Sequence, residues 1–190
     1  LMKYKILLLI LIFAIVIIFL FITLKPFRQN VDIPILLYHD FTLVLPDEDP
    51  DDFNYINTSK SFEENIKTLL DNGYTFLSFK DLNDAYLNKK DLPSKPILLT
   101  FDDGYYSNYE YIFPILKKYN IKAAIFIVTD NIGKTIDGKK YLTWKQCQDM
   151  YNSNLVEIFS HSTRHVFYDK LPVYELQKDV LKSYEIIEKN

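Results

Sequence analysis

The sequence contains little cysteine, glycine or histidine, and these scarcities narrow the kinds of protein that it can encode. Of its 190 residues, one is cysteine, four are glycine and three are histidine. The single cysteine, Cys147, excludes an internal disulfide and stands apart from any cluster of metal-ligating residues, so we expect it to be a small buried side chain. The low glycine content leads to no functional conclusion. With only three histidines, the position of each one along the chain becomes informative.

An excess of positive charge is also lacking. The chain carries 22 basic and 25 acidic residues, a formal net charge of −3. Lys3 and Lys5 are the only charged residues before position 25, so the remainder carries a net charge of −5. No basic stripe is present in this remainder. The charge balance therefore gives no electrostatic case for binding nucleic acid.

One long hydrophobic run is present, at the N-terminus. Residues 6–22 are uninterrupted apolar residues, which is close to the roughly 20 needed to cross a bilayer and longer than the roughly 7–15 of a signal-peptide core. We therefore expect an uncleaved signal anchor over 1–24, a linker over 25–34 and a folded domain over 35–190. This predicts a single-pass protein of the cell membrane with its domain outside the cytoplasm. A cleaved signal peptide and a secreted domain remain the alternative.

Beyond the linker, short apolar runs predict buried strands. The run over 96–101 has no polar interruption except one threonine, as expected of a parallel strand covered on both faces. The other runs are bounded by turn residues or by helical patterns. The predicted strands cover residues 35–38, 75–77, 96–101, 123–128 and 155–159.

Helical patterns fill the segments between these strands. Capping boxes over 61–64 and 143–146 predict two helix starts, Ser78 predicts a third, and residues 109–119 have helical spacing. Strict alternation of strands and helices predicts an α/β domain with a parallel sheet, either open or closed into a barrel. The last helix follows Pro172, and its expected apolar face consists of Leu176, Val180, Tyr184 and Ile187.

Polar side chains suited to catalysis follow three of the predicted strands. Asp102 and Asp103 come directly after 96–101, His161 and His165 follow 155–159, and His39 follows 35–38. All three histidines of the chain thus lie just past a strand. In parallel α/β folds, the carboxyl ends of the strands carry the active site. We therefore expect these side chains to meet at one edge of the sheet.

These residue types indicate a metal site. Adjacent carboxylates repel unless a cation or a donor offsets them, and a metal bound by one of them leaves the other as a general base. His161 and His165 are spaced so that two imidazoles can converge on one ion. Two imidazoles and one carboxylate leave a coordination position for water, which is the catalytic zinc pattern, and they suit Zn²⁺ or Co²⁺ better than Mg²⁺ or Ca²⁺. The alternatives are a solvated Asp-Asp-Gly turn and two surface histidines.

Two sequence motifs resemble those of a known family. Residues 100–105, Thr-Phe-Asp-Asp-Gly-Tyr, resemble the first motif of the polysaccharide deacetylases (carbohydrate esterase family 4, the NodB homology domain). Residues 161–165, His-Ser-Thr-Arg-His, resemble the second motif of this family. The segments 33–39 and 155–160 are also similar to the family. The resemblance covers residues 33–190 and, through 33–39, is strongest to the poly-N-acetylglucosamine deacetylases.

The resemblance implies a role for individual residues. Asp102 matches the general base that activates water, Asp103 the carboxylate ligand of the metal, and His161 and His165 the imidazole ligands. The family implies a deformed (β/α) barrel that removes acetyl groups from N-acetylated polysaccharides such as poly-N-acetylglucosamine or peptidoglycan. Tyr105, beside the first motif, is a candidate for binding the sugar.

The sequence departs from the family after the second motif. The arginine of the third motif and the aspartate of the fourth have no match, so we expect a barrel that is incomplete at the C-terminus. In the poly-N-acetylglucosamine branch, an N-terminal Tyr-His segment supplies the catalytic acid, and His39 matches it; a hydrogen-bonded histidine at a strand end is the alternative. Two functional alternatives also stay open: an inactive, membrane-tethered glycan-binding relative, and a different metal hydrolase such as an amidase.

Overall fold

Five parallel strands form the sheet that organises the described part of the chain. The computed structural model describes residues 32–43, 56–88 and 90–190. Every strand predicted from the sequence is present, with boundaries that differ by at most one residue. The strands are β1 (Ile35–Tyr38), β4 (Thr75–Leu77), β5 (Pro96–Phe101), β6 (Ala123–Ile127) and β9 (Val156–Ser160).

The strand order brings the predicted functional residues to one edge of the sheet. The order is β1-β5-β6-β9, and β4 pairs with the first half of β5. Tyr38 of β1 pairs with Phe101 of β5, and Ile127 of β6 pairs with Ser160 of β9. Because all pairs are parallel, the residues that follow β1, β5 and β9 leave the sheet on the same side.

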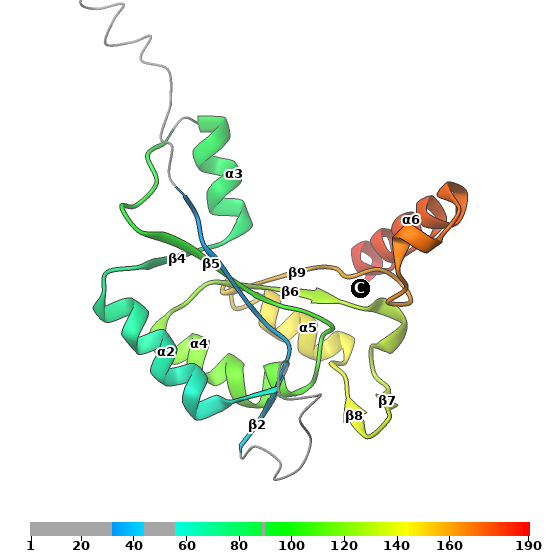
Figure 1. Ribbon diagram of the computed structural model, residues 1–190, viewed down its shortest axis with the longest axis horizontal. Coiled ribbons are helices and arrows are strands. Elements are labelled where there is room, and N and C mark those ends of the chain that lie inside the picture. Colours follow the sequence, from blue (N-terminus) through cyan, green and yellow to red (C-terminus); the bar gives the residue numbers. More distant parts are fainter. Residues whose placement is uncertain (1–31, 44–55, 89) are drawn as a thin grey trace, which may run out of the picture. The chain divides into compact units, whose positions relative to one another are not determined.

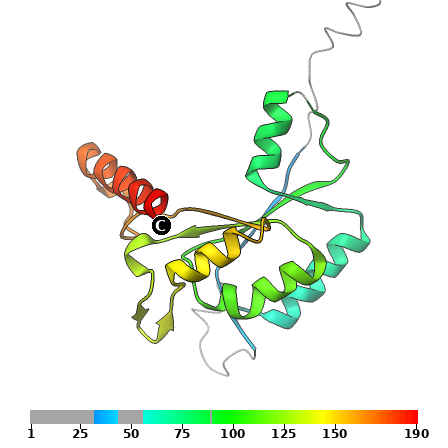
Figure 2. The same ribbon diagram turned by 180° about the vertical axis from the view of Figure 1, so that it is seen from behind.

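The helices lie on both sides of this sheet. In both views, α2 (Ser59–Asp71), α4 (Phe113–Tyr119) and α5 (Trp144–Tyr151) lie on one side, and α3 (Phe79–Asn88) lies on the other (Figures 1 and 2). A π-helical turn, η1 (Asn108–Ile112), leads directly into α4, so the predicted helix over 109–119 is two consecutive helical types. The last helix, α6 (Val173–Lys189), begins after Pro172 as predicted.

The predicted helix starts are mostly confirmed. Thr143 forms the expected capping box with Gln146, and the Ser78 hydroxyl accepts a hydrogen bond from the Asp81 backbone N–H at 3.0 Å. The capping box predicted at Ser61 is wrong. Helix α2 begins earlier, because the Thr58 hydroxyl accepts the hydrogen bond of the Ser61 backbone N–H at 3.1 Å and thereby caps the helix itself.

Several short elements were not predicted. Strands β2 (Asp40–Thr42) and β3 (Ile56–Thr58) pair in parallel, and β7 (Thr135–Ile136) and β8 (Lys139–Lys140) form a small hairpin. A single helical turn, η2 (Thr129–Asn131), follows β6. Another, η3 (Tyr168–Lys170), precedes α6. These elements carry no apolar run of the kind that predicted the strands of the sheet.

The core fills the space between the sheet and the helices α2, α4 and α5. Phe62 of α2, Phe101 of β5 and Leu116 of α4 have no exposed surface. The rings of Phe62 and Phe101 lie 5.9 Å apart within a cluster of aromatic side chains. Cys147 of α5 is buried, as predicted, and burial raises the pKa of its thiol to about 12.

Helix α6 buries only part of the face that the sequence predicted, since Leu176 is partly buried and Ile187 packs against the core. Val180 and Tyr184 are 42% and 59% exposed, whereas Asp179 and Ser183 are 4% and 0% exposed. The prediction followed apolar spacing alone. The buried face instead follows hydrogen bonds, because the carboxylate and the hydroxyl on it bind the segment after β9.

No helix in the described ranges combines the length and the apolar character of a membrane span. The predicted anchor over 1–24 and residues 25–31 of the predicted linker lie outside the described residues.

Candidate metal centre

A sharp turn after β5 presents the two aspartates. The backbone N–H of Asp102 donates to the Tyr38 carbonyl at 2.9 Å, which continues the pairing of β5 with β1. The chain then takes left-handed conformations at Asp103 and Gly104, with φ of 69° and 78°. A side chain at Gly104 would place its Cβ 2.9 Å from the Ile127 Cγ2 atom. Only glycine fits here, because both the backbone angle and the close approach exclude a Cβ.

Asp103, His161 and His165 converge. The Oδ1 atom of Asp103 lies 3.2 Å from the Nε2 atom of His165 and 3.6 Å from that of His161. The two imidazole rings are 5.1 Å apart between their centroids. One ligand atom from each residue lies within 4.8 Å of the others, and no other group of three is found in the parts of the chain that the structure describes.

The geometry of these three side chains fits a divalent ion. Ligand atoms bonded to zinc at about 2.1 Å in a tetrahedral arrangement lie about 3.4 Å apart, close to the two distances from Asp103. The Asp103 Oδ1 atom is buried and accepts no hydrogen bond from any described residue. Burying a carboxylate oxygen without a partner is costly, and a cation between it and the imidazoles would compensate for that burial. The donor set of two nitrogens and one oxygen suits a borderline ion.

Asp102 lies beside this group rather than in it. Its Oδ2 atom is 4.0 Å from the Nε2 atoms of both His39 and His161. Burial raises the pKa of Asp102 above its ordinary value of 3.8, and the nearby imidazoles partly offset that effect. The structure therefore brings five predicted residues together, which are His39, Asp102, Asp103, His161 and His165. They come from the ends of three separate strands.

Tyr105 also lies next to the turn, but one face of its ring is covered. The ring stacks on that of Tyr141 with centroids 4.9 Å apart, and the two residues form a β-bridge. Burial and a hydrogen bond with Tyr141 raise the pKa of Tyr105 well above its ordinary value, so the hydroxyl stays protonated. The Lys139 ammonium also lies over this ring, 5.5 Å from its centroid, so a sugar would have to contact the part of the side chain that Tyr141 and Lys139 leave open.

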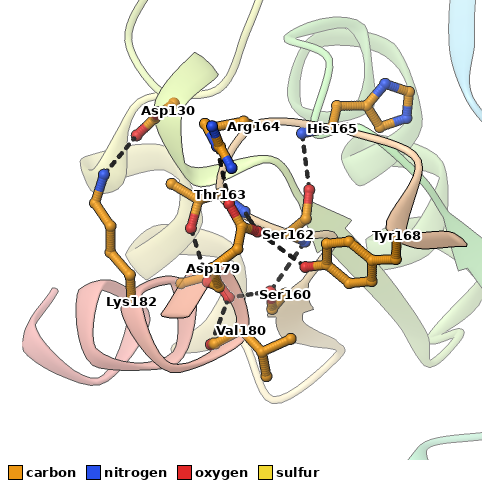
Figure 3. Close-up of polar contacts among 11 residues, drawn as sticks. Asp130, Ser160, Ser162, Thr163, Arg164, His165, Tyr168, Asp179, Val180 and Lys182 are labelled. Atoms are coloured by element: carbon orange, nitrogen blue, oxygen red, sulfur yellow. Dashed lines mark hydrogen bonds and ion pairs between the residues drawn. The ribbon is translucent and has the colours of Figure 1, made fainter. Parts of the chain in front are cut away.

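The segment that carries the two histidines is held in an unusual conformation. Ser162 and His165 have φ of 74° and 55°, in the left-handed region that non-glycine residues rarely adopt. The backbone N–H of His165 donates to the Ser162 hydroxyl at 2.8 Å (Figure 3). The backbone N–H of His161 donates to the Ile127 carbonyl at 2.8 Å, which fixes the start of the segment against β6.

Sequence reasoning missed the residues of α6 that support this segment. Both Asp179 and Ser183 are buried. Asp179 accepts a hydrogen bond from Thr163 within the segment, and Ser183 accepts one from Ser160, the last residue of β9 before it. A signal was available in the sequence. Leu176, Asp179, Ser183 and Ile187 are spaced by three or four residues, so two small polar residues lie on a helical stripe that begins and ends with apolar ones.

The chain is similar in sequence to one protein family and to several named proteins. A family model described as polysaccharide deacetylase matches residues 89–190. The protein YxkH of Bacillus subtilis, whose name places it among the polysaccharide deacetylases, is 34% identical over 165 residues, which are 85% of this chain and 53% of that protein. The poly-β-1,6-N-acetyl-D-glucosamine N-deacetylase of Staphylococcus epidermidis is 34% identical over 110 residues, 57% of this chain and 38% of that enzyme. The chain thus spans about half or less of the length of these relatives.

A solved structure has a similar fold. The Streptococcus pyogenes deacetylase PplD, determined in complex with acetate, superposes with a TM-score of 0.72. The two proteins are 28% identical, and the match covers 85% of this chain and 70% of the other.

Proposed function

The chain belongs to the polysaccharide deacetylase family and has its α/β NodB-type fold, and we propose that it hydrolyses N-acetyl groups of an extracellular or cell-wall polysaccharide, poly-N-acetylglucosamine or peptidoglycan. The observation that carries this proposal is the convergence of Asp103, His161 and His165 next to a second carboxylate, Asp102. The similarity to a poly-N-acetylglucosamine deacetylase supports the choice of an N-acetylated glycan as substrate.

In the proposed mechanism, Asp103, His161 and His165 would hold a divalent ion, Zn²⁺ in the first instance and Co²⁺ as a substitute. Such an ion would supply Lewis acidity for an acetyl carbonyl and for a water molecule. The carboxylate and the imidazoles orient the reacting groups because they come from two rigid strand ends.

Asp102 is the general base and His39 the general acid. The Asp102 carboxylate is not needed as a ligand, and at 4.0 Å from the His161 Nε2 atom it can take a proton from a water that lies at the metal site. The His39 Nε2 atom lies 4.0 Å from the same Asp102 oxygen, and in its protonated form the imidazole can donate its proton to the departing sugar amine. Tyr105, at the rim of the same turn, contacts the sugar.

The proposed location is the outer face of the cell membrane. Its support is the apolar run over 6–22, which would anchor the chain by one span. Secretion after cleavage is the alternative. Membrane fractionation of cells that express the chain tests this part: release of the chain into the medium would contradict the anchor.

The proposed activity is tested by acetate release. The purified chain, loaded with zinc, is incubated with an oligomer of β-1,6-linked N-acetylglucosamine, and acetate is measured with a coupled enzyme assay. We expect acetate from the unaltered chain and none from His161→Ala, which loses a metal ligand. Release of acetate that is equal in both proteins, or absent from every N-acetylated glycan despite bound zinc, would contradict the proposal.

A further inference from the structure

Asp179 is a buried residue in the middle of α6. The hydrogen bonds that its carboxylate accepts come from the segment 161–168, which carries the two histidines. Its Oδ2 atom accepts hydrogen bonds from the Thr163 backbone N–H and the Tyr168 hydroxyl, both at 2.9 Å (Figure 3). Its Oδ1 atom accepts from the Arg164 Nε atom at 3.2 Å, and its backbone carbonyl accepts from the Thr163 hydroxyl at 2.9 Å. One residue of a helix thus makes four bonds to three residues of one segment.

The residues that bond to Asp179 are close in sequence to the two histidines of the proposed metal site. Thr163 and Arg164 lie between His161 and His165, and Tyr168 lies just beyond them. The side chain of His165 points away from Asp179, so the helix holds the backbone of the segment from behind and leaves the imidazole free to face Asp103 (Figure 3). Asp179 therefore acts on the two histidines through the backbone, because the hydrogen bonds that its carboxylate accepts within the described part of the chain come from Thr163, Arg164 and Tyr168.

The segment needs such support because its own backbone does not favour this shape. Two non-glycine residues, Ser162 and His165, adopt left-handed angles, which are sterically unfavourable for an L-residue. Without outside contacts, the segment would relax to other angles and separate the imidazoles. Strain of this kind persists only where surrounding structure over-determines it.

A second contact from the same helix supports the same segment. The hydroxyl of Ser160 donates to the Ser183 hydroxyl at 2.7 Å and accepts from the Ser162 backbone N–H at 3.1 Å. Ser183 lies one helical turn after Asp179. The buried polar stripe of α6 thus contacts the segment before and between the two histidines.

The carboxylate is held in its charged form. Burial by itself would raise the pKa of Asp179, but the hydrogen bonds from the Thr163 N–H, the Tyr168 hydroxyl and the Arg164 guanidinium lower it below the ordinary value of 3.8. Hydrogen bonds to an ionised acceptor are about twice as strong as those between neutral groups. The Asp179 carboxylate therefore holds its partners more strongly than an amide or a hydroxyl at this position would.

We propose that Asp179 is a positioning residue that presets the segment 161–168, so that the His161 and His165 imidazoles already converge on Asp103 before a metal ion binds. This inference rests on the proposed metal site and deepens it. It predicts that the charge of Asp179 matters for metal affinity and for the geometry around the ion, and not only for folding.

The test compares metal binding by Asp179→Asn and by the unaltered chain. Asparagine keeps the size of the side chain, but it loses the charge and one acceptor. We expect zinc affinity, measured by calorimetry on the metal-free protein well below its melting temperature, to fall about 10- to 100-fold. We also expect the visible absorption spectrum of the Co²⁺-loaded protein to change, because the two imidazoles no longer hold one geometry. Lys178→Ala is the matched control, since Lys178 is the exposed neighbour on the same helix.

The outcomes separate this inference from the proposed function. Zinc affinity and a Co²⁺ spectrum that are unchanged in folded Asp179→Asn would overturn the positioning role, even if the variant melts at a lower temperature. Failure of the unaltered chain to bind zinc would overturn the metal site and the inference with it. If Asp179→Asn does not fold, Tyr168→Phe takes its place, because it removes a single hydrogen bond to the carboxylate. An intermediate loss of zinc affinity in Tyr168→Phe would support the positioning role. An unchanged zinc affinity would contradict it.

Discussion

Asp102 and Asp103 are neighbours in sequence, yet their carboxylates face different surroundings. The left-handed backbone at Asp103 turns its side chain toward the two imidazoles, where its Oδ1 atom is buried. Asp102 stays on the course of β5 and points between His39 and His161. Adjacent residues thus occupy two different positions, which are the proposed ligand position for Asp103 and the proposed base position for Asp102.

The separation of roles predicts different effects for the two aspartates. Asp102→Asn should keep zinc affinity, because Asp102 is not among the converging ligands, and should lower acetate release about 10²- to 10⁴-fold through loss of the base. Asp103→Asn should lose zinc affinity as well. Calorimetry and the acetate assay on both variants check this. Full activity of Asp102→Asn would remove it from the mechanism.

The only cysteine offers a test of the core at the scale of one side chain. Burial raises the pKa of Cys147 to about 12, so at neutral pH the thiol is protonated as well as inaccessible. We expect no reaction of the folded chain with a chromogenic disulfide reagent, and reaction of one thiol per chain in urea. Rapid labelling of the folded protein would show that α5 does not pack as described.

Residue types near strand ends were the part of the site that the sequence could predict. Asp102, Asp103 and the three histidines lie where alternating strands and helices place them, because parallel strands end at one edge. Asp179 was not predictable in the same way. Its role depends on which face of α6 meets the segment after β9, and hydrogen bonds decided that face against the apolar pattern.

At the scale of elements, Glu157 joins two that are far apart in sequence. Its carboxylate, on β9, accepts the backbone N–H groups of Phe79 at 2.7 Å and Lys80 at 3.0 Å, the first residues of α3. These N–H groups have no partner within the helix, so the glutamate caps it from outside. Strand β9, which precedes the histidine pair, is thereby tied to α3.

This cap predicts a loss of stability on truncation. Glu157→Ala should lower the free energy of unfolding by about 1–2 kcal/mol, because two charge-assisted hydrogen bonds to a helix start are lost. Glu157→Gln keeps one accepting oxygen and should lose less. Urea unfolding of the three proteins measures the difference. Equal stability of Glu157→Ala and the unaltered chain would show that the cap contributes nothing.

A second link between elements makes stability depend on pH. The Lys122 ammonium donates to both oxygens of Asp81, at 2.8 and 2.7 Å. Burial would raise the pKa of Asp81, but the bonds from Lys122 and Ser78 lower it below the ordinary value of 3.8. A lowered pKa in the folded state means that this contribution is present above 3.8 and is lost as the pH falls through the lower, folded value.

We therefore expect Asp81→Asn to be less stable than the unaltered chain at about pH 6, and this difference to shrink toward about pH 2. Urea unfolding over this range measures it. Asp84→Asn is the control, since the pair of Lys80 and Asp84 is exposed and should contribute little at any pH. A difference for Asp81→Asn that stays constant with pH would contradict the linkage.

For the described molecule as a whole, the sequence predicted the α/β class, the parallel sheet and the strand boundaries, since these follow from strong apolar runs and turn residues. It did not predict the pairing of β2 with β3. It also did not predict the hairpin β7–β8, although the Asp137-Gly138 turn, with positive φ at both residues, is a local signal for such a hairpin. The order β1-β5-β6-β9 matters most for function, because it brings residue 39, the two aspartates and the histidine pair together from segments that are far apart in sequence.

The central claim is that Asp103, His161 and His165 bind one divalent ion. Crystals of the chain grown with zinc, measured at the zinc absorption edge, test it most directly. We predict a single anomalous peak about 2.0–2.2 Å from one oxygen of Asp103 and one nitrogen of each histidine. No peak at this position, or a peak held by other residues while these three side chains are ordered, would contradict the claim.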